Sequence, residues 1–244
     1  MKPSQKIKQN VVNQIAKTTL YENVSELMKM QQIYEAGIKE IRTKLEILDA
    51  EFKVKHDHNP IHHIESRLKS PESILKKAIN KDIPVTERSL EENIHDIAGI
   101  RVICNYVDDV YKVAQLLTDQ DDIRLVEVKD YIANPKESGY MSLHLVLEVP
   151  IFLSEGSKPI HVEVQLRTIA MDFWASLEHK LKYKKDIASD QLTADLKKCA
   201  DESAALDLKM DAIRKEIEVL KAPEAKAIGR EVKHLPGGIL NENQ

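Results

Sequence analysis

Two long stretches of the chain carry apolar residues at steps of three and four, the spacing of one face of an α-helix. The first runs from about Val24 to Phe52 and the second from Leu192 to Leu220, with lysines and glutamates on the other faces. This heptad-like spacing predicts two long helices. Either both pack on a central domain, or one or both also bury surface against another subunit.

Between the two predicted helices, short β-branched segments alternate with helical ones. The extended segments lie at residues 61–69, 97–104, 123–132, 142–149 and 160–166. A Pro-containing break at 58–61 ends the first long helix, and Ser70 begins a short one. Two aspartates cap a predicted helix over 107–117, and Thr168 caps another over 169–183. The interleaving predicts an α/β (α+β) fold, in which helices lie against a mixed sheet.

The chain therefore divides into four predicted regions. They are an N-terminal helical region (1–55), an α/β region (56–185), a C-terminal helix (186–222) and a tail (223–244). Prolines and glycines after Lys221 predict that the tail is mobile.

The amino-acid composition argues against several classes of function. Of the 244 residues, 42% are hydrophobic and 31% are charged, which is typical of a globular protein with a core. The net charge of −4 argues against nucleic-acid binding driven by overall charge. Only 7 residues are glycine, and their spacing forms neither a GxGxxG nor a Walker-type loop. Side chains would therefore have to bind any nucleotide.

Cysteine usage and hydropathy indicate the compartment. Cys104 and Cys199 are far apart and form no CxxC, which fits a reducing cytosol and argues against a disulfide framework or a zinc ribbon. No apolar run approaches the roughly 18–20 residues that span a bilayer, and the first residues form no apolar signal segment. The sequence predicts a cytoplasmic protein that does not contact membranes.

Two carboxylates occupy positions suited to burial. Asp96 precedes the apolar run 97–104, and Glu163 lies inside the predicted strand 160–166. A buried carboxylate is unfavourable unless it meets a metal, a cation or several donors. One face of the second strand is a polar row, made of His161, Glu163, Gln165 and Arg167. Such a row is either a solvated sheet face or a functional cleft.

Cations gather around the first extended segment. Arg67 and Lys69 share one of its faces, and Ser73 and Lys77 share one face of the helix that follows. Cations and a hydroxyl at a helix N-terminus suit a triphosphate, although such a cluster is also typical of a solvated surface. Arg101 lies inside an apolar strand, where it needs an anion or a flat ring to stack on.

A loop that contains Lys129, Lys136 and Gly139 leads to Tyr140, whose ring is suited to stacking a base. His144 lies on the same side of the predicted strand, roughly 13 Å further along by the rise per residue. A packed tyrosine and a histidine with internal partners are the alternative interpretation.

Four segments, in this order, resemble the motifs of the RelA/SpoT synthetase family. They are SRLKSPESILKK (66–77), HDIAGIRVIC (95–104), VKDYIANPKESGYMSLH (128–144) and VEVQLRTIAMDFWASLEHK (162–180). The resemblance covers about residues 56–185, so this region is expected to be a synthetase domain with a nucleotidyltransferase-like core. The chain is similar to the small alarmone synthetases, nearer the RelP than the RelQ type. That resemblance implies a homotetramer, and the two long helices are the candidate contacts.

The resemblance also implies an activity, that of a Mg²⁺-dependent GTP diphosphokinase, with Mn²⁺ as a substitute metal. Such an enzyme moves the β,γ-diphosphate of ATP to the 3′-OH of GDP or GTP and yields AMP with ppGpp or pppGpp, the alarmones of the stringent response. Diphosphate transfer requires charge neutralisation, in-line positioning and one base, which agrees with the residues identified above.

Site residues are implied position by position. Asp96 and Glu163 match the Mg²⁺-binding carboxylates, and Glu163 also matches the residue that deprotonates or orients the 3′-OH. The matches on the ATP side are Arg67, Lys69, Ser73, Lys77, Arg101 and Lys129. Among these, Arg67 and Arg101 match the pair that sandwiches adenine. The matches on the GDP/GTP side are Tyr140, which would stack on guanine, Lys136, His144, Gln165, Asp172 and Glu178.

One position departs from the family pattern. Between Tyr140 and Ser142 the family usually has Arg or Gln, and this chain has Met141. If a basic residue there helps to bind the phosphates of the acceptor, Met141 removes that help. Acceptor affinity or the preference between GDP and GTP would then differ.

Two other functions are alternatives. His95-Asp96 is also the dipeptide of HD-type metal phosphohydrolases, but here it leads into a strand, and the histidines at 56, 58, 62 and 63 lie in a Pro-containing loop. The second alternative is a helical oligomer that binds single-stranded RNA through its basic clusters. It would not explain why two carboxylates accompany the cations, although RNA binding stays open as a secondary activity.

Overall fold

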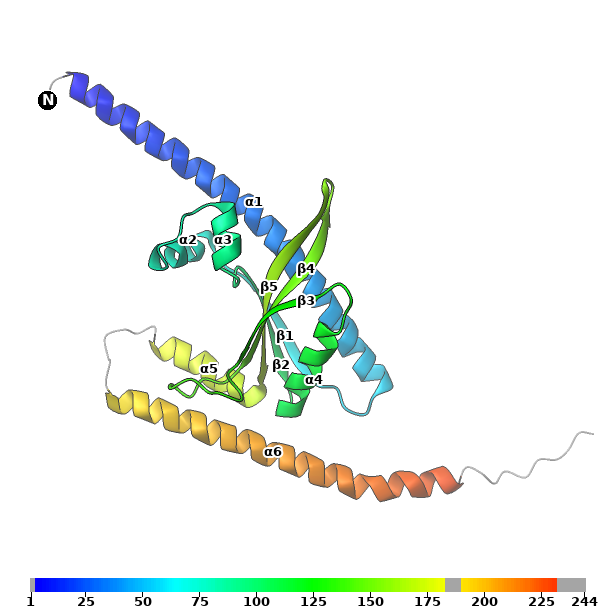
Figure 1. Cartoon of the computed structure of the whole chain (residues 1–244). Coiled ribbons are helices and arrows are strands. Elements are labelled where there is room, and N and C mark those ends of the chain that lie inside the picture. Colours follow the sequence, from blue (N-terminus) through cyan, green and yellow to red (C-terminus); the bar gives the residue numbers. More distant parts are fainter. Residues whose placement is uncertain (1–2, 183–189, 232–244) are drawn as a thin grey trace, which may run out of the picture.

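The computed structural model describes residues 3–182 and 190–231 of the chain (Figure 1), with side chains placed over 28–181 and 191–220. Within these ranges, no helix has the length and apolarity needed to cross a membrane.

A five-stranded mixed sheet forms the centre of the fold (Figure 1). Its strands are β1 (Ile61–Leu68), β2 (Ala98–Cys104), β3 (Arg124–Asp130), β4 (Leu143–Leu153) and β5 (Gly156–Thr168). Their order across the sheet is β1-β2-β5-β4-β3, in which β2 and β5 are parallel and all other neighbours are antiparallel. The five predicted strands and the mixed sheet are confirmed.

Strands β4 and β5 extend further than the sequence predicts. They form one hairpin that pairs residues from Leu143 to Leu153 with residues from Leu166 back to Gly156. Pro150 and Pro159 face each other in this hairpin, and prolines inside a strand weaken the sequence signal for it. Gly156, with φ +129°, makes the tight turn possible.

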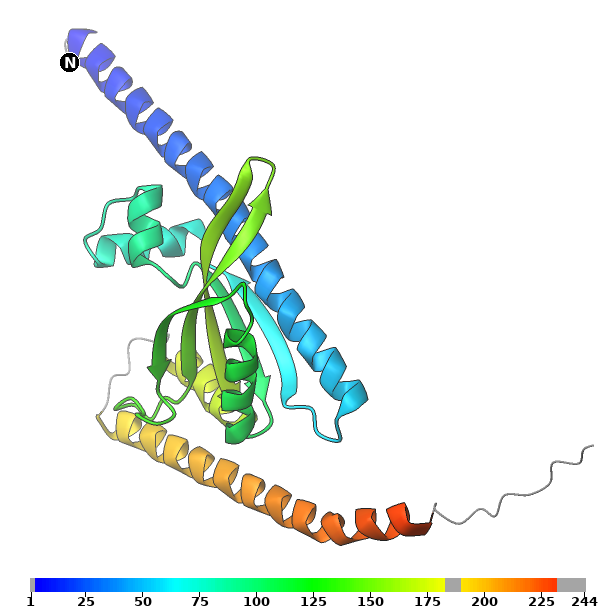
Figure 2. The same ribbon diagram turned by 45° about the vertical axis from the view of Figure 1, so that its right-hand side comes forward.

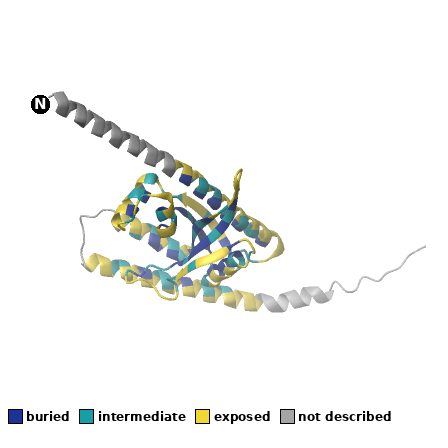
Figure 3. Ribbon diagram, turned by 45° about the horizontal axis from the view of Figure 1, so that its top comes forward, coloured by how far each residue is buried: buried dark blue, intermediate teal, exposed yellow. Residues whose placement is uncertain are grey.

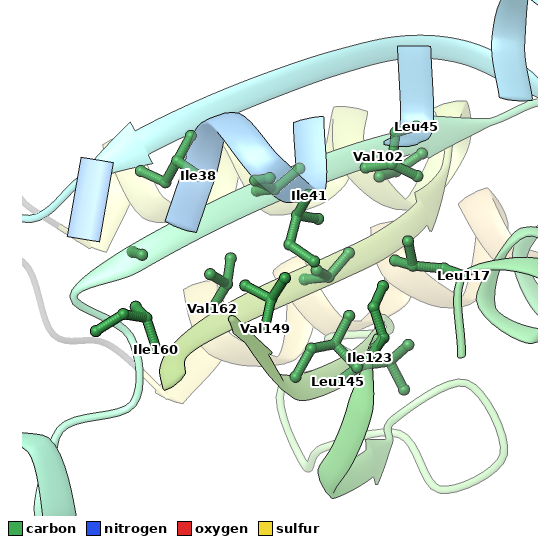
Figure 4. Packing of buried hydrophobic residues seen from close by; sticks show 14 of the residues in the cluster. Ile38, Ile41, Leu45, Val102, Leu117, Ile123, Leu145, Val149, Ile160 and Val162 are labelled. Carbon is green, nitrogen blue, oxygen red and sulfur yellow. The ribbon is translucent and has the colours of Figure 1, made fainter. Parts of the chain in front are cut away.

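Helices α1 (Pro3–Lys55) and α4 (Val107–Thr118) cover one face of the sheet (Figure 1). Ile38, Ile41 and Leu45 of α1 are buried there, and Figure 4 shows them beside the sheet residues Val102 and Val162. The first predicted long helix therefore packs on the central domain. It begins well before residue 24, where its apolar spacing starts.

Close approach of α1 to the sheet requires Gly37. A Cβ atom at this position would lie 3.0 Å from Cγ2 of Ile160 and 3.2 Å from Cγ2 of Val162. Because the helix backbone lies directly on the sheet, larger side chains on either side of Gly37 can interdigitate with it.

Two short helices follow β1. Helix α2 (Pro71–Asn80) begins as predicted, with Ser70 Oγ accepting a hydrogen bond from the Ser73 amide at 3.3 Å. Helix α3 (Glu87–Asn93) was not predicted from the sequence, because its seven residues are too few for a clear apolar period.

The caps predicted for helices α4 and α5 are confirmed to different degrees. Asp109 accepts from the Tyr106 amide at 3.2 Å at the start of α4, whereas Asp108 contacts Arg214 and Lys215 instead. One of the two predicted aspartate caps is therefore wrong. Thr168 Oγ1 accepts from the Met171 amide at 3.2 Å and caps α5 (Ile169–Lys182) as predicted.

Helix α6 (Asp190–Glu231) lies against α5 near one end of the sheet (Figure 2). Trp174 Nε1 donates to the Leu196 carbonyl at 2.9 Å, and Ser203 Oγ donates to the Ala170 carbonyl at 3.0 Å. Over residues 191–220, most of α6 is exposed (Figure 3). The helix continues past residue 222, where the sequence predicts a tail, and residues 232–244 of that tail lie outside the described residues.

Candidate functional site

The two faces of the sheet differ in polarity. Alternate residues of β5 face the core, and the residues between them, including Glu163, face the opposite side. Strand register aligns one polar row across all five strands, made of Glu65, Arg101, Gln165, His144 and Lys129. We call this side the polar face. A cavity of about 160 Å³ opens on it between β1, β2 and β5.

Asp96, at the entry to β2, faces two lysines. Its Oδ2 lies 2.6 Å from Lys69 Nζ and 2.8 Å from Lys77 Nζ. Burial alone would raise the pKa of Asp96, but hydrogen bonds from the two lysines hold this pKa below its ordinary value. The carboxylate is therefore ionised at neutral pH.

Glu163 points into the same cavity from β5. Its Oε1 lies 3.3 Å from His144 Nδ1, and its Oε2 accepts a hydrogen bond from Gln165 Nε2 at 2.8 Å. Burial would raise the pKa of Glu163, as does the charge of Asp96, but the hydrogen bonds from His144 and Gln165 lower the pKa overall. This second carboxylate is also ionised.

The residues present fit a magnesium ion. Asp96 Oδ1 is buried and has no hydrogen-bond partner among the described residues, and Asp96 and Glu163 line one cavity. Magnesium usually takes one or two protein carboxylates and completes its shell with water and phosphate oxygens. The described ranges contain no group of three or more His, Cys, Asp or Glu suited to a metal, a number that a site of this kind does not require.

Two arginines line the cavity around a glycine. Arg67 lies opposite Gly99 in the β1–β2 register, and Arg101 follows two residues later on the same face. Arg101 Nη1 lies 3.4 Å from both Glu65 Oε2 and Asp172 Oδ1, whereas its buried Nε has no hydrogen-bond partner among the described residues. Gly99 lines the cavity beside the two arginines and adds no side chain to it.

Tyr140 and His144 touch, which corrects the predicted separation of roughly 13 Å. Tyr140 Oη lies 2.8 Å from His144 Nε2. Strand β4 begins only at Leu143, and the backbone turns at Gly139, whose φ is +86°. The rise per residue of a strand therefore does not apply to Tyr140.

Aromatic side chains and a lysine lie close together at the loop before β4. Lys136 Nζ lies 4.4 Å from the ring centroid of Tyr131 and 4.8 Å from that of Tyr140. Tyr131 also meets His144 edge-on, with ring centroids 5.3 Å apart. Sequence reasoning missed Tyr131, although it lies within the quoted segment 128–144.

Helix α6 supports this loop from behind. A Cβ atom at Gly139 would lie 2.4 Å from Cβ of Ala200, so the loop backbone touches α6 directly. Tyr140 packs against a small cluster formed by Trp174, Ala175 and Ala200. The position of Tyr140 thus depends on a helix that is distant in the sequence.

The other predicted site residues lie outside the lining of the cavity. Ser73 is in the first turn of α2, one turn before Lys77, and does not line the cavity. Lys129 pairs with Glu127 at 2.9 Å on the edge strand β3. Glu178 is half-buried on α5 and outside the cavity lining. Asp172 instead contacts Arg101, as described, and Arg167 at 3.1 Å.

Comparison with known proteins decides the family. The profile described as "Region found in RelA / SpoT proteins" matches residues 66–188, half of the chain. The chain belongs to the RelA/SpoT family.

Two curated members from Bacillus subtilis are similar to it over most of their length. GTP pyrophosphokinase YwaC is 46% identical over 187 residues, covering 76% of this chain and 89% of that protein. GTP pyrophosphokinase YjbM is 38% identical over 190 residues, covering 78% and 89%.

Solved structures of RelA/SpoT members have the same fold. Small alarmone synthetase 1 from Bacillus subtilis, bound to its product pppGpp, has a TM-score of 0.70 at 38% identity, covering 75% of this chain and 94% of that one. Small alarmone synthetase 2 from the same organism also has a TM-score of 0.70, at 44% identity, covering 77% and 97%. The predicted fold class is confirmed.

Met141, where the chain departs from the usual RelA/SpoT pattern, does not line the cavity on the polar face. It lines a narrow space between the loop, α5 and α6, together with Met171, Trp174 and Ala200. An apolar side chain fits this lining, which the sequence alone could not reveal.

Arg167 is a site residue that sequence reasoning noted only as part of the polar row. It is 5% exposed, and it contacts Tyr140, Gln165 and Asp172. A signal was present, since an arginine that continues a strand's polar row beside a glutamate requires partners.

Proposed function

We propose that this protein is a GTP pyrophosphokinase that makes ppGpp from GDP or pppGpp from GTP. The observation that carries the proposal is the pairing of Asp96 and Glu163 in one cavity with Lys69 and Arg101. An anionic substrate and a metal would meet both charge types there. The relatives named GTP pyrophosphokinase, and the related structure with its product pppGpp, support the same reaction.

In the proposed reaction, the 3′-oxygen of the acceptor attacks the β-phosphorus of ATP. The bond between that phosphorus and the oxygen bridging to the α-phosphate breaks, and AMP leaves with the oxygen. The proton of the 3′-OH passes to Glu163. Because hydrogen bonds lower the pKa of Glu163, it is a weak base by itself. Mg²⁺, when bound, neutralises phosphate charge and lowers the pKa of a nearby hydroxyl, and Mn²⁺ is the substitute we expect.

We assign metal binding to two carboxylates, and substrate binding to the residues around them. Asp96 and Glu163 would hold the metal. On the ATP side, Arg67 and Arg101 would enclose adenine, while the triphosphate would meet Lys69, Ser73, Lys77 and Lys129. On the acceptor side, Tyr140 would stack on guanine, with contacts from Lys136, His144, Gln165, Asp172 and Glu178.

The two alternatives are less well supported. His95 Nε2 contacts the Glu92 carbonyl at 3.2 Å, next to the start of β2 rather than inside a helical metal centre. Pure RNA binding leaves the paired carboxylates without a role, although a second, RNA-binding activity is compatible with the proposal.

We further propose a cytoplasmic homotetramer, nearer the RelP than the RelQ type. Part of the α6 apolar row is exposed, with Leu206 at 57%, Met210 at 49% and Ile213 at 50%. Leu206 and Met210 line a groove of about 810 Å³ together with Phe173 of α5, which is 65% exposed. Such a surface favours burial against a second copy.

Light scattering should give four times the 27.8 kDa chain mass, and Met210→Glu should lower this measured mass. A monomeric wild type would overturn this proposal.

Product analysis tests the proposed reaction. Purified protein receives γ-labelled ATP and Mg²⁺, with GDP, GTP or neither, and anion exchange separates the products. We expect label in a guanosine tetra- or pentaphosphate, together with AMP, only when an acceptor is present. Label released as phosphate would favour the hydrolase, and salt-dependent RNA binding without turnover would favour the RNA-binding protein.

A further inference from the structure

Arg167 lies at the start of two hydrogen-bond routes that lead to the same carboxylate. A guanidinium has donors only, so each of its contacts fixes the partner atom as an acceptor. Arg167 Nη2 donates to Gln165 Oε1 at 3.0 Å and to Tyr140 Oη at 2.6 Å. Both partners continue toward Glu163.

The first route passes through the Gln165 amide. Because Oε1 accepts from Arg167, the amide nitrogen is turned the other way, and Nε2 donates to Glu163 Oε2 at 2.8 Å. The reversed amide would set donor against donor at Arg167 and acceptor against acceptor at Glu163. Arg167 thereby selects the orientation in which Gln165 presents an N–H to the carboxylate.

The second route passes through Tyr140 and His144. His144 Nδ1 lies 3.3 Å from Glu163 Oε1, and because a carboxylate oxygen accepts, a hydrogen on Nδ1 is the arrangement that suits this contact. In a neutral imidazole Nε2 then has no hydrogen, and the 2.8 Å contact with Tyr140 requires that the tyrosine hydroxyl donates. The hydroxyl is free to do so because its oxygen accepts from Arg167.

We propose that Arg167 is a positioning residue that directs two N–H donors, one from Gln165 and one from His144, onto the two oxygens of Glu163. A carboxylate has about four lone-pair sites, so this arrangement leaves one on each oxygen for the cavity. The inference rests on the proposed function only in taking Glu163 as the base. The hydrogen-bond directions hold for the chain without substrate.

The chemistry of arginine suits this position. Its planar fork supplies five donors in fixed directions, whereas a lysine is a compact point charge. Asp172, with Oδ1 at 3.1 Å from Arg167 Nη1, balances the buried charge. Lysine would retain the charge but lose the geometry that holds Gln165 and Tyr140 together.

A double-mutant cycle tests the proposal. Arg167→Met, and to a smaller degree Arg167→Lys, should lower kcat, with about a 10- to 100-fold loss for methionine, the size typical of residues that orient a functional side chain by hydrogen bonds. The KM for ATP should stay within about twofold. In the Glu163→Gln background the same changes should have no further effect, because Arg167 acts through Glu163. An equal loss in both backgrounds, or no loss in either, would overturn the proposal.

A spectroscopic measurement tests the hydrogen-bond directions without requiring activity. At alkaline pH, the side-chain ¹⁵N spectrum of the wild type, with His144 assigned through His144→Gln, should show the Nδ1–H tautomer. The Nε2–H tautomer would overturn the proposal even if turnover is normal. A wild type that makes no alarmone would refute the proposed function alone, because the spectrum would still test the hydrogen-bond directions.

Arg124→Lys is the matched control. Arg124 makes a two-pronged contact with Glu148 on β4, is mostly exposed and lies outside the cavity. Its kinetics should match those of the wild type. Should Arg167→Met fail to fold, as judged by thermal melting, Arg167→Lys and the wild-type spectrum decide the question.

Discussion

The two halves of the polar face are built in different ways. The half that we propose binds the donor ATP, called the donor half, contains Arg67, Lys69, Asp96 and Arg101 and lies on or directly beside β1 and β2. These strands belong to a sheet whose other face is packed against α1. The half that we propose binds the acceptor GDP or GTP, called the acceptor half, depends on the loop that carries Tyr140, and this loop touches α6 at Ala200. The donor half is therefore fixed by the main core, and the acceptor half by the docking of one helix.

This difference predicts separate responses to mutation. Disturbing α6 or its loop should weaken acceptor binding and leave ATP binding unchanged. Disturbing Glu163, which lies between the halves on β5, should stop the reaction itself.

The largest effect is expected for Glu163→Gln. The amide keeps the size of the side chain but cannot take the proton of the 3′-OH, so kcat should fall by about 10²- to 10⁴-fold. Binding of a non-hydrolysable ATP analogue, measured by calorimetry, should remain. Full activity of this variant would contradict the assignment of the base.

The second largest effect is expected for Tyr140→Ala. Loss of a stacked base is worth about 1–3 kcal/mol, so the KM of GDP or GTP should rise by about 5- to 150-fold. The KM of ATP should change far less, because Tyr140 belongs to the acceptor half. Steady-state kinetics with each substrate varied in turn will measure the split, and equal changes in both KM values would argue against stacking.

Gly139→Ala should raise the KM of the acceptor about tenfold without affecting ATP. Its φ of +86° disfavours a side chain, and the new Cβ would lie 2.4 Å from Cβ of Ala200. Adding Ala200→Gly should relieve the clash and restore part of the affinity. Gly156→Ala is the matched control, since Gly156 also has a positive φ, of +129°, but no atom within 4 Å of the added Cβ. If this control changes the acceptor KM equally, contact with α6 is not the cause.

The smallest effect is expected for Asp207→Asn, on stability rather than turnover. Asp207 of α6 accepts from Thr168 Oγ1 at 2.5 Å, and burial raises its pKa. A raised pKa in the folded state means that this carboxyl's contribution to stability is lost as pH rises through that pKa. Asparagine still accepts the hydrogen bond but does not ionise. We expect a melting temperature about 2–4 °C higher at pH 7.5.

The pH dependence provides the control for this variant. Its advantage should shrink as pH falls and vanish once Asp207 of the wild type is protonated. An advantage that is constant with pH would point to packing instead of charge.

The same division explains how much the sequence could predict. Local spacing was enough to predict the five strands and the packed part of α1, and it placed Arg67 and Arg101 on strands, where the structure has them. It failed where long-range contact decides the structure. Tyr140 was assigned to a strand, because nothing nearby in the sequence reveals that Gly139 turns against Ala200. Arg167 was only part of a polar row, because its partners come from three separate segments.

Whether the diphosphate is transferred intact can be read from the fate of the ATP phosphorus atoms. A ³¹P NMR time course of the wild type with ATP, GDP and Mg²⁺ follows all three ATP phosphorus atoms at once. We predict that AMP and a new 3′-diphosphate ester appear in equal amounts, without ADP or inorganic phosphate. ADP together with inorganic phosphate, and no diphosphate ester, would contradict the transfer of an intact diphosphate.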